Sequence, residues 1–231
     1  MSFIADTKEA LLHWFFPHTC VGCGSSLLEK TSCLCLQCIS KMPVTNYAST
    51  KDNPVEKLFW GRLHVKSAGA SFYFSKKSLM QELLHECKYG GNKELLFQLG
   101  KMMGEHLKNQ DRFDVDALVP LPLHRHKEKK RGYNQALLLC EGMAEVLNLP
   151  IKNDLVIRNS STDTQTKKDR LNRWSNMEGK FSLKEKIGIG THLLLVDDVI
   201  TTGATLEACG QSLLQLDGVQ LSIFALCYSS N

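Results

Sequence analysis

The stretch Leu193–Leu206, LLLVDDVITTGATL, decides the fold class of this chain of 231 residues. Leu193 to Val196 form a short apolar run that two acids end abruptly, a pattern typical of a buried strand in a parallel sheet. Asp197 and Asp198 therefore fall at the carboxyl end of that strand, where open α/β sheets bind their ligands. The pattern predicts an α/β fold with a site at this edge.

A small, hydroxyl-rich turn follows the acids and precedes a predicted helix. Its residues are Thr201, Thr202, Gly203, Ala204 and Thr205. Backbone N–H groups, hydroxyls and a glycine at a helix start suit a phosphate. The two carboxylates would repel that phosphate, so we expect their partners to be donors such as sugar hydroxyls. A ribose 5-phosphate has both features. The alternative is structural, since Asp and Thr also cap helices.

These fourteen residues resemble the 5-phosphoribosyl 1-diphosphate (PRPP) motif of type I phosphoribosyltransferases. The resemblance implies that Asp197 and Asp198 contact the 2- and 3-hydroxyls of the ribose, and that residues 201–205 hold the 5-phosphate. In a transferase the two acids would be the catalytic residues, because they orient the ribose while positive charge builds at C1.

Composition narrows the class of protein. The chain is 43% hydrophobic, with a formal net charge of +4, and is long enough for a main domain with a small appendage. The charge permits anionic ligands without requiring nucleic acid. No apolar run approaches the roughly 20 residues that span a bilayer. An acid replaces the basic start of a signal peptide, so we expect a cytoplasmic protein with no membrane span.

Four cysteines form the second strong motif. Cys20-x-x-Cys23 and Cys35-x-x-Cys38 are separated by eleven residues, a layout close to that of zinc ribbons. Four thiolates complete a tetrahedral Zn²⁺ and leave no open position, so the site would be structural. Cys33 stays open as a ligand in place of Cys35. Disulfides would need an oxidising compartment, and reduced cysteines without a metal are the other alternative.

Polar composition over Lys41 to Pro54 indicates a linker and places a domain boundary there. We predict an N-terminal helix and zinc-ribbon module over residues 1–50 and a phosphoribosyltransferase-like domain over 51–231. The sheet of that domain is expected to contain strands near 116–119, 154–158, 192–196 and 220–227. Strand 67–75 and helices over 79–88, 94–108, 134–147 and 206–216 are also expected.

The segment from Val119 to Leu139 carries the third motif. Two prolines end a strand, and a basic loop then leads through Gly132 into a helix. A basic loop before a helix start suits a diphosphate, and Arg131-Gly132 lies where phosphoribosyltransferases place their diphosphate clamp. The alternative is a solvated loop, or one that binds nucleic acid nonspecifically. Lys88 and Tyr89 precede a Gly-Gly turn. We expect them at the solvated surface, and the alternative is that they project toward a pocket.

Together the motifs resemble the ComF/GntX-like (competence protein ComF) branch of the superfamily, often described as amidophosphoribosyltransferase-like. The resemblance covers nearly the whole chain. It includes the paired knuckles, Lys88-Tyr89-x-Gly91, V-P-x-P, R-G-Y-N-Q at Arg131–Gln135, D-D-V-x-T-T-G-A-T, and a T-x-x-Q…R-x-x-N…F pattern from Thr162 to Phe181. The polar stretch Asn159–Lys180 is expected to be a mobile hood over the site.

Two classes of function follow from the resemblance. In the first, Mg²⁺ and Arg131 bind the diphosphate of PRPP, and an acceptor that no residue identifies receives the phosphoribosyl group. In the second, the protein does not catalyse a reaction. It senses PRPP, or it holds single-stranded DNA during competence and DNA uptake, with other uptake proteins as partners.

Overall fold

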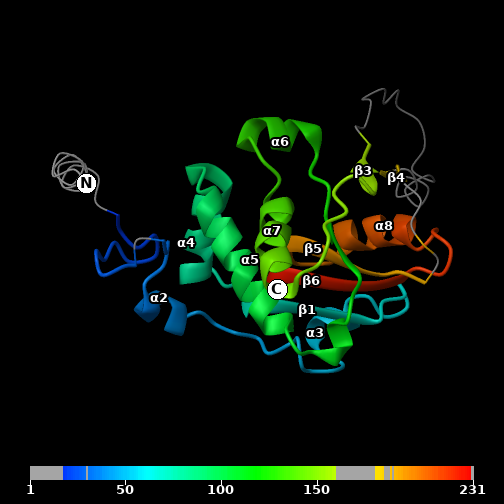
Figure 1. Ribbon diagram of the computed structural model, residues 1–231, viewed down its shortest axis with the longest axis horizontal. Helices are drawn as coiled ribbons and strands as arrows, with labels where there is room; N and C mark the ends of the chain where they lie inside the picture. Colours follow the sequence, from blue (N-terminus) through cyan, green and yellow to red (C-terminus); the bar gives the residue numbers. More distant parts are fainter. Residues whose placement is uncertain (1–17, 30, 160–179, 185–187, 189, 230–231) are drawn as a thin grey trace, which may run out of the picture.

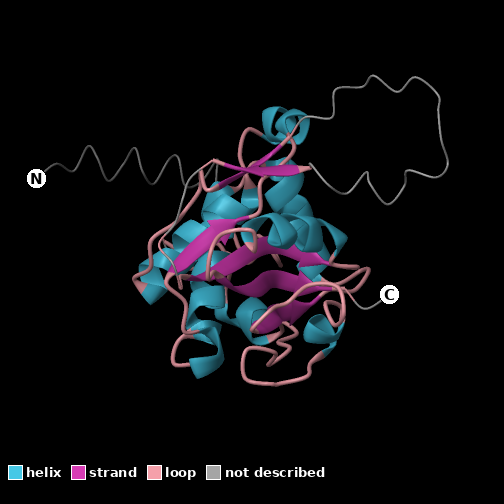
Figure 2. Ribbon diagram, turned by 90° about the vertical axis from the view of Figure 1, so that its right-hand side faces the viewer, coloured by secondary structure: helices cyan, strands magenta, loops and turns pink. Residues whose placement is uncertain are grey.

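The computed structural model describes residues 18–29, 31–159, 180–184, 188 and 190–229. Its centre is a four-stranded sheet in the order β1-β6-β5-β2, in which every neighbouring pair is parallel. The strands are β1 (Ser67–Tyr73), β6 (Gln220–Tyr228), β5 (His192–Ile200) and β2 (Ala117–Pro120). The predicted fold class, a parallel sheet with flanking helices, is confirmed (Figures 1 and 2).

Helices cover both faces of this sheet. Alternate residues of β5 belong to two separate cores. Leu194 and Val196 lie in the core formed with α5 (Lys93–Leu107) and α7 (Gln135–Leu147). Leu193 and Leu195 lie in the core formed with α8 (Ala204–Leu213). β5 is therefore buried on both faces, as its continuous apolar run predicts.

Glycines allow α5 and α7 to approach each other closely. A Cβ on Gly100 would lie 2.3 Å from the Leu139 carbonyl oxygen, and one on Gly142 would lie 2.1 Å from the Phe97 carbonyl oxygen. No larger residue fits at either position unless the backbone moves. The close contact between α5 and α7 forms a helical layer, and the N-terminal part of the chain packs on α5 of this layer.

The remaining elements surround this frame. They are α2 (Leu36–Ser40), α3 (Pro54–Lys57), α4 (Leu79–His85), the π-helical turn η1 (Glu86–Gly90), the 3-10 turn η2 (Asp111–Phe113), α6 (Arg125–Arg131), β3 (Val156–Arg158) and β4 (Phe181–Leu183). Within the described ranges, no helix combines the length and apolar character needed to cross a membrane.

The predicted strand 154–158 is displaced from the main sheet. β3 pairs antiparallel with β4 in a separate two-stranded sheet, and a single bridge between Leu118 and Ile151 is the contact beside β2. β3 has only three residues, and two of them are half-buried, so it does not form the doubly buried strand that a central position requires.

The basic segment after β2 is a helix, where the sequence predicted a loop. The His124 side chain accepts a hydrogen bond from the His126 N–H at 3.3 Å and caps the start of α6. Gly132, with φ of 80°, ends the helix in the left-handed conformation that glycine adopts without strain. Both caps are formed by neighbouring residues, and they define a short helix that the charge pattern alone did not predict.

The cysteine-containing segment packs directly on α4 and α5. The Gln98 amide accepts a hydrogen bond from Cys33 N–H at 2.7 Å and donates one to the Thr31 carbonyl at 2.5 Å. The segment expected as a linker lies along β1, since Thr45 N–H donates to the Ser71 carbonyl and Tyr47 is buried. The domain boundary near residue 50 stays a prediction.

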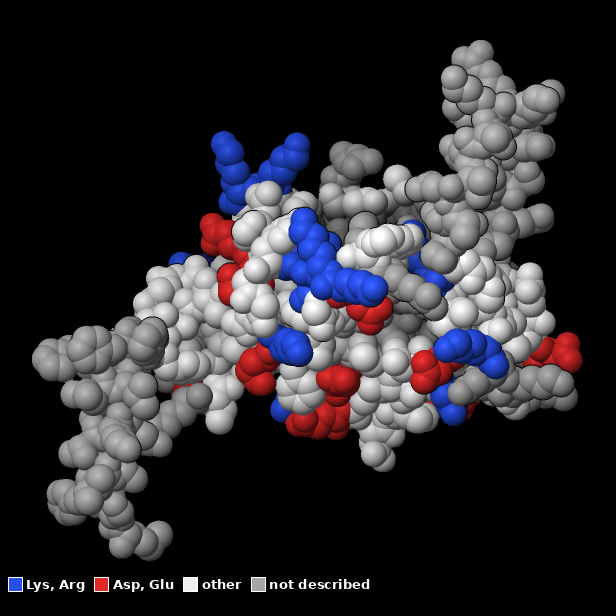
Figure 3. Space-filling view, turned by 90° about the horizontal axis from the view of Figure 1, so that it is seen from above, with Lys and Arg blue, Asp and Glu red and all other residues white. Residues whose placement is uncertain are grey.

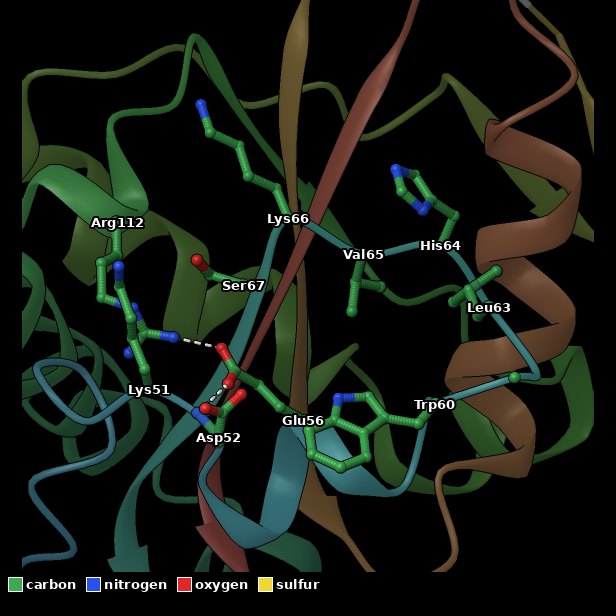
Figure 4. A pocket seen from close by; sticks show the side chains of 11 residues that line it. Lys51, Asp52, Glu56, Trp60, Leu63, His64, Val65, Lys66, Ser67 and Arg112 are labelled. Carbon is green, nitrogen blue, oxygen red and sulfur yellow. Dashed lines mark hydrogen bonds and ion pairs between the residues drawn. The ribbon is translucent and has the colours of Figure 1, made fainter.

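A cavity of about 530 Å³ opens at the amino end of β1, beside Ser67 (Figure 4). An ion pair between Glu56 of α3 and Arg112 of η2 lies at one side of it. The Glu56 carboxylate also accepts the N–H groups of Asp52, at 2.6 Å, and Ala68, at 3.3 Å. Because Glu56 is only 8% exposed, this pair ties α3, β1 and η2 together.

We predict that Arg112→Ala lowers the free energy of unfolding by about 2–4 kcal/mol, because it leaves a buried carboxylate without its partner. Urea denaturation measures the change. Lys51→Ala, at an exposed position of the same cavity, is the control and should change stability by less than about 0.5 kcal/mol. The double variant Glu56→Gln/Arg112→Met should lose less free energy of unfolding than Arg112→Ala, because no buried charge is left without a partner. Equal losses in Arg112→Ala and the control would contradict the assignment.

Candidate functional site

Asp197 and Asp198 lie within the carboxyl-terminal half of β5, and the ladder with β6 continues past them to Ile200. The sequence predicted that the strand ends at Val196. β6 extends to Tyr228 and continues the pairing beyond the acids. Side chains alternate along a strand, so Asp197 and Asp198 leave β5 in opposite directions, but the charge of Asp198 still acts on the Asp197 carboxyl group. Both acids are half-buried, so they are held by the sheet and still reach solvent.

Lys88 of η1 belongs to this site, and the prediction that it is a solvated surface residue was wrong. Its ammonium lies 3.0 Å from the Asp198 carboxylate, with side chains 25% and 17% exposed. The Tyr133 hydroxyl donates to the Cys87 carbonyl at 2.5 Å and links the start of α7 to η1. Tyr89 is exposed as expected. The Lys-Tyr-Gly-Gly sequence was the available signal for this site. The direction of the Lys88 side chain, however, depends on the π-helical turn η1, which the sequence pattern did not predict.

Burial raises the pKa of the Asp197 carboxyl well above its usual range, and the nearby charge of Asp198 raises it further. The N–H of Asp198 donates to Asp197 at 2.8 Å and opposes this shift only in part. Since the folded-state pKa is raised, ionised Asp197 destabilises the fold as the pH rises above the normal carboxyl range. Hydroxyl donors or a cation from a ligand would stabilise this pair of carboxylates.

The loop over residues 201–205 presents unpaired backbone donors. The N–H groups of Thr201, Thr202 and Gly203 have no hydrogen-bond partner in the part of the chain that the structure describes. The Ala204 N–H contacts only the Thr202 hydroxyl, at 3.5 Å. Gly203 has φ of 73° and is the N-cap of α8. Consecutive free amides at the start of a ten-residue helix form a concave donor group for an anion.

Two residues that the sequence analysis did not single out contact this loop. The Phe59 ring lies beside Gly203, and Arg62 donates to the Thr202 carbonyl at 3.2 Å. Arg62 and Thr202 are 140 positions apart in the chain. No spacing pattern could relate residues at that separation, so only the tertiary structure reveals the contact.

The predicted diphosphate residues lie at the same edge of the sheet, because the carboxyl end of β2 pairs with β5 at Pro120 and Val196. Arg131 is half-buried and donates to the Gln135 amide oxygen at 2.8 Å, and Gly132 follows it. Lys129 and Lys130 are exposed on α6. Figure 3, seen from the side of α6, shows Lys and Arg side chains gathered near the middle of this face.

Most of the expected hood, with its T-x-x-Q and R-x-x-N elements, lies outside the described residues. Of that pattern, Phe181 is described. It is buried in β4 against the core that contains α8, and the Arg158 guanidinium lies 5.6 Å from the centre of its ring.

The four predicted metal ligands come together. The sulfur atoms of Cys20, Cys23, Cys35 and Cys38 all lie within 4.8 Å of one another. Cys33 is buried but lies outside this group, so the structure favours Cys35 over Cys33. Burial acts to raise the pKa of Cys20, but backbone hydrogen bonds, first from Cys35, lower it to about 6. The cluster has the donor set and the compactness of a tetrahedral metal site.

Sequence comparisons find similarity to DNA utilization and competence proteins. No family model matches it. DNA utilization protein YhgH of Salmonella typhimurium is 28% identical over 223 residues, which cover 94% of this chain and 92% of that protein. Competence protein ComFC of Bacillus subtilis is 29% identical over 85% of this chain and 78% of its own length. Competence protein F of Haemophilus influenzae is 34% identical over 48% of this chain and 49% of its own length.

Structural comparison finds phosphoribosyltransferases. Glutamine PRPP amidotransferase from Bacillus subtilis is 20% identical, with a TM-score of 0.39, over 55% of this chain and 25% of that one. Adenine phosphoribosyltransferase from Saccharomyces cerevisiae is 16% identical, with a TM-score of 0.35, over 64% of this chain and 72% of that one.

The sequence alignments confirm the resemblance that the motifs of this chain indicate. They extend over 94% of the chain for YhgH and 85% for ComFC, so they are not confined to one motif. The chain is similar over most of its length to YhgH and ComFC, and over about half of its length to competence protein F.

Proposed function

We propose that the protein binds PRPP, or another phosphoribosyl ligand, at the carboxyl edge of its parallel sheet. Asp197 and Asp198 bind the ribose hydroxyls, and the loop 201–205 binds the 5-phosphate. The observation that carries the proposal is that three amides without a partner among the described residues lie next to two carboxylates. A ligand that satisfies both groups must carry an anion and hydroxyl donors in one molecule, and a phosphoribosyl group does.

The diphosphate is assigned to Arg131, Gly132 and the adjacent basic helix α6. Lys88 adds a positive charge beside Asp198. Carboxylate oxygens are the ligands that Mg²⁺ takes from proteins together with phosphate oxygens, so Asp197 and Asp198 fit that ion. When bound with the diphosphate, Mg²⁺ would neutralise the charge of that group.

The same arrangement supports transfer of the phosphoribosyl group. The bond between C1 and the diphosphate oxygen would break, an acceptor would bond to C1, and diphosphate would leave. Carboxylates held near the ribose stabilise positive charge that develops on the sugar, because the sheet has already fixed their positions. The acceptor is not specified by any described residue.

A second function, binding of single-stranded DNA, has its own supporting observation. Lys129 and Lys130 are exposed on α6. Lys and Arg side chains gather near the middle of the face seen from above (Figure 3). Exposed cations bind the phosphate backbone without reading its sequence. The relatives are named for DNA utilization and competence. The proposed partners are therefore single-stranded DNA and other DNA-uptake proteins, in the cytoplasm.

The cysteine cluster is proposed to hold one structural Zn²⁺. Four sulfur donors within 4.8 Å of one another fit a closed tetrahedral site without a position for substrate. Gly22 has no space for a side chain, since a Cβ there would lie 2.7 Å from the Leu79 side chain and 3.0 Å from the Cys38 sulfur. We retain residues 1–50 as the zinc-ribbon module and 51–231 as the phosphoribosyl-binding domain.

We predict that Asp198→Asn weakens PRPP binding at least about tenfold, because hydrogen bonds to a charged acceptor contribute about 1.5–3 kcal/mol. Titration calorimetry with PRPP and Mg²⁺ measures the affinity. Asp217→Asn, an exposed carboxylate in the turn after α8, is the matched control and should bind as wild type does. Equal affinity in Asp198→Asn and wild type would remove the assigned ribose contact. Diphosphate release with a screened acceptor would establish catalysis.

Purified protein is expected to contain one zinc ion per chain by elemental analysis. Cys35→Ser should lose the metal and melt at a lower temperature, because a structural Zn²⁺ stabilises the folded state. Cys33→Ser removes a thiol from the same segment but outside the cluster, so it should retain the metal. If Cys33→Ser lost the metal and Cys35→Ser retained it, Cys33 would be the ligand instead of Cys35.

For the second function, Lys129→Glu/Lys130→Glu should weaken binding of a labelled single-stranded oligonucleotide. Removing two phosphate contacts should make the slope of log K against log salt concentration shallower by about 1.4. Fluorescence anisotropy at several salt concentrations measures both. The control Lys41→Glu/Lys57→Glu changes two exposed lysines outside α6 by the same charge. Binding that is absent in wild type, or equally reduced by the control, would reject α6 as a DNA site.

A further inference from the structure

A turn from the N-terminal part of the chain, Phe59–Leu63, lies against the loop assigned to the 5-phosphate. Arg62 makes the principal contacts. Its guanidinium donates to the Leu58 carbonyl at 3.0 Å, to the Thr202 carbonyl at 3.2 Å, and to the Glu207 carboxylate. Arg62 and Glu207 have side chains 40% and 13% exposed. One side chain therefore joins the turn after α3, the loop and the first turn of α8.

The contact with Thr202 fixes the direction of a loop amide. The carbonyl of Thr202 and the N–H of Gly203 belong to one planar trans peptide, so they point in opposite directions. When Arg62 holds the carbonyl, the Gly203 N–H is aimed away from Arg62. This N–H has no partner among the described residues. A bond on one side of the peptide thus presents a free donor on the other.

Phe59 holds the same peptide from behind. It is fully buried, and its ring would lie 2.9 Å from a Cβ on Gly203. Gly203 therefore needs glycine for two reasons: its φ of 73° and the space that Phe59 occupies. The loop cannot relax toward Phe59, because the ring already fills that volume.

We propose that Arg62 is a positioning residue for the 5-phosphate and that Phe59 is the surface against which it holds the loop. The inference rests on the proposed function of the loop. Arg62 need not touch the ligand. It orders the amides before the phosphate arrives, so binding does not have to order them at that moment. Loss of Arg62 should weaken the binding of ligands that carry the 5-phosphate and leave the affinity for other ligands unchanged.

An electrostatic explanation must be separated from this one. Removing Arg62 also leaves the Glu207 carboxylate without its cation near the phosphate loop, and that charge alone would repel a phosphate. Glu207→Gln in the same chain removes the repulsion but does not restore the bond to the Thr202 carbonyl. The double variant therefore distinguishes loop geometry from charge.

The experiment compares wild type, Arg62→Ala, Arg62→Ala/Glu207→Gln and Lys57→Ala by calorimetry. The ligands are PRPP with Mg²⁺, ribose 5-phosphate and inorganic diphosphate. Lys57 is exposed in the same segment, over the Trp60 ring, and is the matched control. Both Arg62 variants should bind PRPP and ribose 5-phosphate about tenfold more weakly and diphosphate as wild type does. Lys57→Ala should bind all ligands as wild type does.

Arg62→Lys keeps the charge beside Glu207, but its single nitrogen cannot join all the acceptors that the guanidinium joins. Its affinity for PRPP and ribose 5-phosphate should therefore lie between those of wild type and Arg62→Ala. This variant replaces Arg62→Ala in the test if Arg62→Ala does not fold. Wild-type affinity in Arg62→Ala, with PRPP binding intact in wild type, would overturn the inference and leave the proposed function standing. Recovery in the double variant would also overturn it and assign the effect to charge. A wild-type protein that binds neither phosphoribosyl ligand would overturn the proposed function itself.

Discussion

The pairing of β5 between β6 and β2 is the constraint on which the rest of the structure depends. Because both neighbours are parallel to β5, its two faces must be covered, and its side chains divide between the core with α5 and α7 and the core with α8. The same ladder carries Asp197 and Asp198 at its far end and starts the loop that leads into α8. A shift of one residue in this register would place Asp197 at the position of the buried Val196 and Val199 at the position of Asp198.

This edge holds a carboxyl group whose charge opposes folding. Asp197 has a raised pKa because burial and a neighbouring carboxylate disfavour its charge. Three loop amides also lack a protein partner within the described chain, and those of the exposed residues Thr201 and Thr202 are open to water. The buried cores on both sides of β5 offset that unfavourable free energy. Free donors at a helix start beside a carboxyl group whose charge is disfavoured form a combination that suits a ligand with both an anion and hydroxyl donors.

The sequence predicted the parts of the site that are local and missed the parts that are joined through space. The apolar run before the acids, the threonine-rich turn and the spacing of the cysteines each lie within a short window, where strand periodicity and ligand spacing are visible. Lys88, Phe59 and Arg62 reach the site from other elements, and no period relates them to β5. The displacement of β3 was missed for a similar reason, because a short strand does not reveal its partner.

The long-range contacts place the site under the control of three separate segments. The turn after α3 contacts the loop 201–205, η1 brings Lys88 to Asp198, and Tyr133 connects the start of α7 to η1. The cysteine cluster reaches the same network, since Gly22 packs against Leu79 of α4, the helix that continues into η1. A metal held by this cluster would thereby stabilise α4, the helix that leads into η1 and Lys88. The cysteine-containing segment is then linked through α4 to the turn from which Lys88 meets Asp198.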